Sequence, residues 1–157
     1  MKRMLTAEVV LLSPSGRTLA PVQIIYDDDE ELFVLKSEFS LIYNGAEYKG
    51  VGADYLWTDT FADLQTKLPK DVKLACCMTC RHGNMCPYGN KENLLFCTQN
   101  LKIASKQELC DVLFEDYEIY EKHAVTSFDY CDNFIYQSDD FYTYNDYLYQ
   151  LRKKENR

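Results

Sequence analysis

A cluster of cysteines constrains this chain more than any other feature of its sequence. Five of the seven cysteines lie between residues 76 and 97, and four of them follow the pattern Cys77-x2-Cys80-x5-Cys86-x10-Cys97. A C-x2-C pair at a turn brings two sulfurs toward one tetrahedral centre, and two later cysteines can complete a four-ligand shell. Thiolates are soft ligands that suit zinc. We therefore predict one structural Zn²⁺ ion bound by Cys77, Cys80, Cys86 and Cys97.

Neighbouring residues leave the ligand set open. Cys76 can replace Cys77, and His82 can replace one of the sulfurs, because imidazole nitrogen also binds zinc. An iron–sulfur cluster and metal-free thiols, with or without a disulfide, are the other interpretations of the same pattern. The two remaining cysteines, Cys110 and Cys131, are expected to be small, packed apolar residues.

Length and composition predict one domain in a reducing compartment. The 157 residues have a mass of 18.4 kDa, and their hydrophobic content of 46% is enough for a core. The longest apolar runs are far shorter than the roughly 20 residues that cross a bilayer. No signal peptide is recognisable, because Glu8 interrupts the first apolar stretch. We expect a cytoplasmic protein without membrane contact, in which clustered cysteines serve as ligands rather than as disulfides.

The charge distribution favours a protein partner. A net charge of −8 argues against binding to nucleic acid, since a phosphate backbone attracts a basic surface. The basic residues concentrate between residues 65 and 106, whereas residues 111–150 are strongly acidic and rich in tyrosine. Either region can face another protein, although tyrosines at helical spacing more often pack into a core. The sequence leaves the oligomeric state open.

The N-terminal third has the pattern of an antiparallel sheet. Branched and aromatic residues predict strands at Leu5–Leu12, Pro21–Tyr26, Leu32–Leu35 and Phe39–Tyr43. Asn44-Gly45 favours a tight hairpin that joins Ile42-Tyr43 to Glu47-Tyr48. The acidic run Asp27–Glu31 is expected to be a solvated hairpin tip, because it lacks the spaced ligands of a calcium loop.

Helical periodicity appears later in the chain. Thr60 and Ser105 each begin a capping-box pattern, and a third helix is expected from Phe141 to Lys153. The predicted fold class is α+β: an antiparallel sheet, a metal-stapled segment and C-terminal helices. The whole chain, 1–157, is expected to be one domain with a β-rich part (1–56), a helix with the Cys-rich segment (57–104), and a helical, acidic, Tyr-rich part (105–157).

Two motifs resemble a known family. The cysteine cluster follows C-x2-C-R-x-G-x2-C-P-Y-G from Cys77 to Gly89, and Tyr-Thr-Tyr-Asn-Asp-Tyr-Leu-Tyr occupies residues 142–149. From Trp57 to Leu151 the chain is similar to an uncharacterised family of short bacterial proteins, a domain of unknown function. The resemblance implies a bacterial, cytoplasmic context and a cysteine site. It implies no substrate, partner or mechanism.

Two functional hypotheses follow from these patterns. The first is a small zinc-stabilised protein-interaction module without catalytic activity, of the kind an immunity protein or an antitoxin represents. The second is a cysteine-dependent redox or thiol-transfer enzyme that uses the Cys77-x2-Cys80 pair, since Arg81 and His82 would lower a thiol pKa. The first is favoured because turn residues, rather than a helix, follow Cys80.

Overall fold

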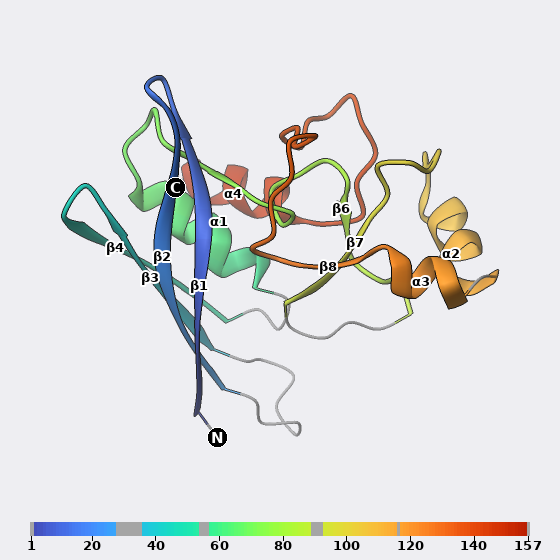
Figure 1. The fold of residues 1–157 in the computed structure, drawn as a ribbon, viewed down its shortest axis with the longest axis horizontal. Coiled ribbons are helices and arrows are strands. Elements are labelled where there is room, and N and C mark those ends of the chain that lie inside the picture. Colours follow the sequence, from blue (N-terminus) through green and yellow to red (C-terminus); the bar gives the residue numbers. More distant parts are fainter. Residues whose placement is uncertain (1, 28–35, 54–56, 89–92, 116, 157) are drawn as a thin grey trace.

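The computed structural model of the protein describes residues 2–27, 36–53, 57–88, 93–115 and 117–156. The strands are β1 (Lys2–Ser13), β2 (Gly16–Asp27), β3 (Ser37–Tyr43), β4 (Ala46–Gly52), β5 (Lys73–Ala75), β6 (Gly83–Asn84), β7 (Leu94–Cys97) and β8 (Ala124–Thr126). The helices are α1 (Thr58–Lys67), α2 (Lys106–Glu115), α3 (Tyr117–Lys122) and α4 (Tyr147–Glu155). Figure 1 shows the long strands β1 to β4 on one side of the molecule, and β6, β7 and β8 with α2 and α3 on the other. The predicted α+β class is confirmed.

The first sheet is the predicted antiparallel meander with one addition. Its strand order is β4-β3-β2-β1-β5, and every pair is antiparallel. The Asn44-Gly45 turn is confirmed: both residues have positive φ, 49° and 77°, and Ile42 pairs with Glu47. The strand predicted at Leu32–Leu35 and residues 28–31 of the predicted hairpin tip lie outside the described residues. The addition is β5, which brings the cysteine-rich segment to the edge of β1.

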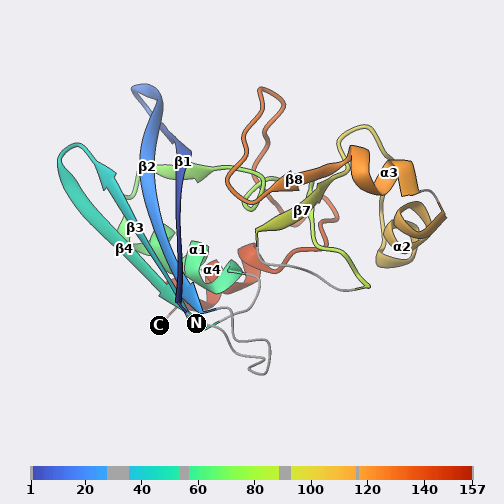
Figure 2. The same cartoon turned by 60° about the horizontal axis from the view of Figure 1, so that its bottom comes forward.

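One face of this sheet carries the main core. Alternate residues of β2 point to opposite faces, so Val22 and Ile24 are buried while Gln23 between them is exposed. Helices α1 and α4 pack together on the buried face (Figure 2). The Phe39 ring lies 5.4 Å from Trp57 and 5.0 Å from Phe61, edge to face. Burial of each such ring contributes about 1.5–3 kcal/mol.

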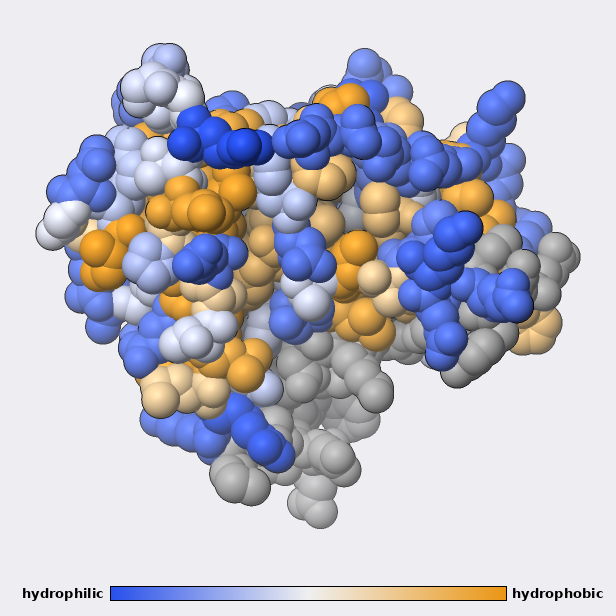
Figure 3. Space-filling view, viewed as in Figure 1, coloured by the Kyte–Doolittle hydropathy of each residue, from blue (hydrophilic) through white to orange (hydrophobic). Residues whose placement is uncertain are grey.

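The other face of the sheet is partly apolar and exposed. Figure 3 shows hydrophobic side chains among polar ones over the long strands. The exposed members include Met4, Leu19, Ile42 and Val51. None of the helices in the described ranges is both long and apolar enough to span a bilayer.

Helix α1 begins earlier than its sequence pattern predicts. Thr58 is its first residue, its N-cap is Trp57 with φ 69°, and no side chain caps it. The capping box predicted at Thr60 is therefore wrong. Asp63 instead accepts a hydrogen bond from the backbone N–H of Val51, 2.8 Å away. This contact forms because Gly50 lets β4 approach the helix closely: a Cβ there would lie 2.6 Å from the Leu64 Cβ.

The other two predicted helices differ in outcome. Ser105 caps α2 as expected, and its Oγ accepts from the Glu108 N–H at 3.2 Å. The last helix begins at Tyr147, so the predicted start at Phe141 is wrong. The preceding residues are irregular because they bind the cysteine-rich segment: the Tyr144 N–H donates to the Asn84 side chain at 2.7 Å.

Candidate metal centre

The Cys77–Gly83 segment folds as consecutive tight turns after β5. The N–H of Cys80 donates to the Cys77 carbonyl at 3.3 Å, and the N–H of Gly83 donates to the Cys80 carbonyl at 3.1 Å. Gly83 lies so close to Cys77 that a Cβ on it would meet the Cys77 carbonyl oxygen at 1.8 Å. Only glycine fits there, and the turn brings Cys77 and Cys80 to the same region.

A segment far along the chain, residues 127–137, packs against these turns. The N–H of Cys77 donates to the Asp129 carbonyl at 2.7 Å, and that of Arg81 donates to the Ile135 carbonyl at 2.8 Å. Cys80 also forms an isolated antiparallel bridge with Tyr136. The backbone polar groups of the turns are thus satisfied by another loop rather than by a sheet.

Strand β7 positions Cys97. Gly83 of β6 pairs with Cys97, and the Cys97 N–H donates to the His123 carbonyl at 2.8 Å. Because Gly83 has no side chain, nothing on β6 separates Cys97 from the Cys77–Cys80 turn at this pair.

These segments line one small, partly open cavity of about 20 Å³. A space of this size holds about one water molecule or one ion. Four cysteines contribute to its lining, together with His82 and Asp129; the cysteines are Cys77, Cys80, Cys97 and Cys131. All four are thiols rather than disulfides. The structure thus brings three of the four predicted ligands to one cavity. The fourth thiol there is Cys131, which the sequence pattern predicted to be a packed apolar residue.

The fourth predicted ligand, Cys86, lies elsewhere. It is buried in a smaller apolar cluster with Phe96, Leu109 and Leu113, on the side of α2. Cys76 is completely buried in the main core, where burial raises the pKa of its thiol to about 12. Cys110 is half-buried, whereas Cys131 is exposed, so the expectation that Cys131 is packed is wrong.

Burial controls the ionisation of two of these thiols, Cys77 and Cys80. It raises the pKa of Cys77 strongly, and the neighbouring Cys76 and Asp129 raise that pKa further. Burial also raises the pKa of Cys80, with backbone hydrogen bonds at Ile135 and His82 acting in the opposite direction. These thiols are protonated at neutral pH when no cation is present, so a bound metal would release their protons.

His82 is the nitrogen donor nearest to these thiols in sequence. Burial, followed by the charge of Arg81, lowers the pKa of its imidazole, which favours the neutral form. Its Nδ1 is buried and has no hydrogen-bond partner among the described residues. Its ring contacts Phe141 edge-on, with centroids 5.4 Å apart.

The thiol and imidazole groups around the cavity fit a thiophilic cation, although they do not form a complete coordination shell. Within the described ranges, no three His, Cys, Asp or Glu side chains already stand in metal-binding geometry. Binding an ion would therefore require the side chains around the cavity to turn inward. For Cys131 this side-chain rotation is a local change, because the side chain is exposed.

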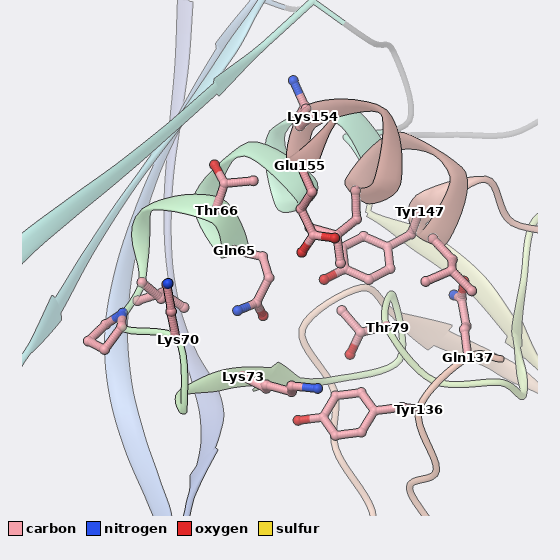
Figure 4. Close-up of a pocket in the computed structure, with 14 residues that line it drawn as sticks. Gln65, Thr66, Lys70, Lys73, Thr79, Tyr136, Gln137, Tyr147, Lys154 and Glu155 are labelled. Atoms are coloured by element: carbon pink, nitrogen blue, oxygen red, sulfur yellow. The ribbon is translucent and has the colours of Figure 1, made fainter. Parts of the chain in front are cut away.

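A larger pocket of about 420 Å³ lies between α1, β5 and α4 (Figure 4). Gln65, Thr79 and Tyr147 face this space. The Gln65 side chain binds the backbone of Val72 and Leu74, and the Thr79 hydroxyl donates to the Leu74 carbonyl. These polar groups therefore order β5 and the turns, and the pocket contains no cysteine.

Comparison with protein-family models, with curated proteins and with solved structures finds no match. The predicted resemblance to a bacterial family stays a prediction.

Proposed function

We propose that this protein is a small zinc-stabilised protein-interaction module without catalytic activity. The observation that supports the metal is the small cavity lined by Cys77, Cys80 and Cys97. Structural zinc sites are closed and rich in thiolate. An ion here would join the C-x2-C turn to β7, and would order a region that has little regular secondary structure.

The small size of the cavity and the burial of the Cys77 and Cys80 thiols favour this proposal over the alternatives. A space of about 20 Å³ suits one ion better than an iron–sulfur cluster with several iron and sulfide atoms. A redox or thiol-transfer enzyme needs an accessible thiol with a lowered pKa. Burial acts against that requirement because it raises the pKa of both Cys77 and Cys80.

The first test is elemental mass spectrometry on untagged, full-length protein, with thiols titrated before and after chelation. We expect about one zinc per chain and additional reactive thiols after the zinc is removed. Cys80→Ser should lose the metal. Cys110→Ser, which changes a thiol outside the cavity, should retain it. Wild-type protein without metal, and with rapidly reacting thiols, would instead favour the redox enzyme.

We also propose that a basic protein binds the acidic groove formed by residues 137–149. This groove has a volume of about 440 Å³ and is lined by Asp139, Asp140, Tyr142 and Tyr149, among others. A hydrogen bond from Ser138 lowers the pKa of Asp140, which keeps its carboxylate charged. Tyr149 is 66% exposed, unlike the buried Tyr147. A charged rim with exposed tyrosine is common at protein interfaces, and this surface would suit an immunity-like or antitoxin-like role.

Charge reversal tests this surface. Asp140→Lys should weaken capture of protein partners that bind the wild type at low salt. Asp71→Lys makes the same charge change at an exposed residue that does not line the groove, and should leave capture unchanged. If a partner is still captured by Asp140→Lys but is no longer captured by Asp71→Lys, the interface lies elsewhere.

A further inference from the structure

We infer that Cys131 is the fourth ligand of the metal, in place of Cys86. The inference rests on the proposed zinc site and completes its coordination shell. Cys131 lines the same cavity as Cys77, Cys80 and Cys97. Four thiols around one ion form the Cys₄ set of many structural zinc sites.

The loop that carries Cys131 is fixed on both sides of it. Asp129, two residues before, accepts from the Cys77 N–H through its carbonyl, and Ile135, four residues after, accepts from the Arg81 N–H. The loop therefore spans the Cys77–Cys80 turn. At its outer side, Arg17 of β2 forms an ion pair with Asp132 at 3.2 Å. Cys131 is thus held near the turn by contacts that do not involve its own thiol.

The register of β7 separates Cys86 from the cavity. Phe96 and Cys97 are adjacent in this strand, so their side chains point to opposite faces. Cys86 packs with Phe96 in the cluster on the α2 side, whereas Cys97 lines the cavity. A metal held by Cys97 would therefore lie across β7 from Cys86.

His82 also lines the cavity, but the same alternation argues against it as the fourth ligand. The Thr98 N–H donates to the His82 carbonyl at 3.0 Å, which extends the β6–β7 pairing by one residue. The side chain of residue 82 is therefore expected on the strand face opposite to that of Gly83 and Cys97. Its ring contacts Phe141, a residue that lines the acidic groove and not the thiol cavity. The unpartnered Nδ1 makes His82 the competing fourth ligand in the experiment.

The exposure of Cys131 is consistent with a ligand at the outer side of the site. An exposed thiol with no metal would be open to oxidation. Coordination of Zn²⁺ by four thiols releases four protons and leaves a centre with a formal charge of −2. The outer position of Cys131 lets water solvate part of that charge.

The experiment uses full-length protein with its metal removed, titrated with Zn²⁺ and with Co²⁺ as a spectroscopic probe. We expect Cys131→Ser to lower Zn²⁺ affinity by more than about 100-fold, which is the upper range for loss of a mere supporting contact. Thiolate-to-cobalt absorption should fall at the same time. Cys86→Ser should retain both affinity and absorption. Cys131→His should restore binding, because imidazole can take the fourth position.

Each outcome separates the two proposals. If the wild type binds neither Zn²⁺ nor Co²⁺, the zinc site and this inference both fail. If the wild type binds the metal and Cys131→Ser does so equally well, the inference is overturned and the zinc site stands. In that case, loss of binding in Cys86→Ser or in His82→Gln identifies the actual fourth ligand. Circular dichroism of Cys131→Ser, which alters an exposed residue, checks that the sheet remains folded.

Discussion

The N-terminal sheet with α1 and the cysteine-rich region with residues 127–146 differ in how their backbones are ordered. In the sheet, β1 and β2 pair over twelve residues each, and the strand ladder satisfies their polar groups. The side chains on the inner face, such as Val9, Ile24 and Phe39, are almost completely buried. This part of the molecule is stabilised by apolar burial on a regular framework.

The cysteine-rich region has short strands and a polar framework. Its strands β6 and β7 contain two and four residues. Side chains satisfy much of its backbone: Thr79 binds the Leu74 carbonyl, Gln137 binds the Met78 carbonyl, and Asn84 binds the Tyr144 N–H. A region of this kind opens more easily than a continuous sheet. This difference explains why a metal ion would add more stability here than in the sheet.

The largest expected effect is in the aromatic core of the sheet. Phe39→Ala should lower the free energy of unfolding by about 3–5 kcal/mol, because it removes a buried ring and leaves a cavity. Phe39 contacts Phe128 at 5.5 Å as well as Trp57, so the loss should affect both regions. Urea unfolding measures the change. Ile42→Ala, on the exposed face of the same strand, should cost less than about 0.5 kcal/mol; equal costs would contradict the assigned faces.

A second prediction concerns the turn of the cysteine-rich region. Gly83→Ala should destabilise the protein by more than about 2 kcal/mol, since the backbone must move to accommodate the new Cβ. The Cβ would lie 1.8 Å from the Cys77 carbonyl oxygen. Zinc content should fall with it. Gly16→Ala is the matched control: φ is 122° there but the space is open, so the cost should be only about 1 kcal/mol.

Asn145 tests the polar framework directly. Its Nδ2 donates to the carbonyls of Met78 and Gly83, each at 2.9 Å, and its Oδ1 accepts from the Tyr147 N–H. Asn145→Ala should cost about 1–3 kcal/mol, because buried partners lose their hydrogen bonds. Amide hydrogen exchange should speed up in the cysteine-rich turns more than in β1. Asn133→Ala, at an exposed position, should change neither; uniform acceleration across the chain would show that the two regions open together.

The same contrast explains how much the sequence could predict. Alternation of apolar residues and the Asn44-Gly45 turn depend on local chemistry, so the meander and its hairpin register were predictable. The position of Cys131 was not, because backbone hydrogen bonds to Cys77 and Arg81 bring its loop back over more than fifty residues of chain. Cys86 follows the spacing of a metal ligand, yet the register of β7 turns it toward α2. Sequence spacing gives only the number of residues between two thiols. Which thiols come together depends on the face of the short strand on which each side chain lies.

The two capping-box patterns provide the smallest and most local test. Ser105 accepts the Glu108 N–H, whereas Thr60 lies inside α1 and its hydroxyl bonds to Ser37 at 2.5 Å. Ser105→Ala should lower stability by about 1 kcal/mol, and Ser105→Gly by only a few tenths, because glycine is tolerated at an N-cap. Thermal unfolding of the pair measures the difference. Equal losses would mean that Ser105 does not act as a cap, and that the start of α2 is set by the packing of Leu109 and Leu113 instead.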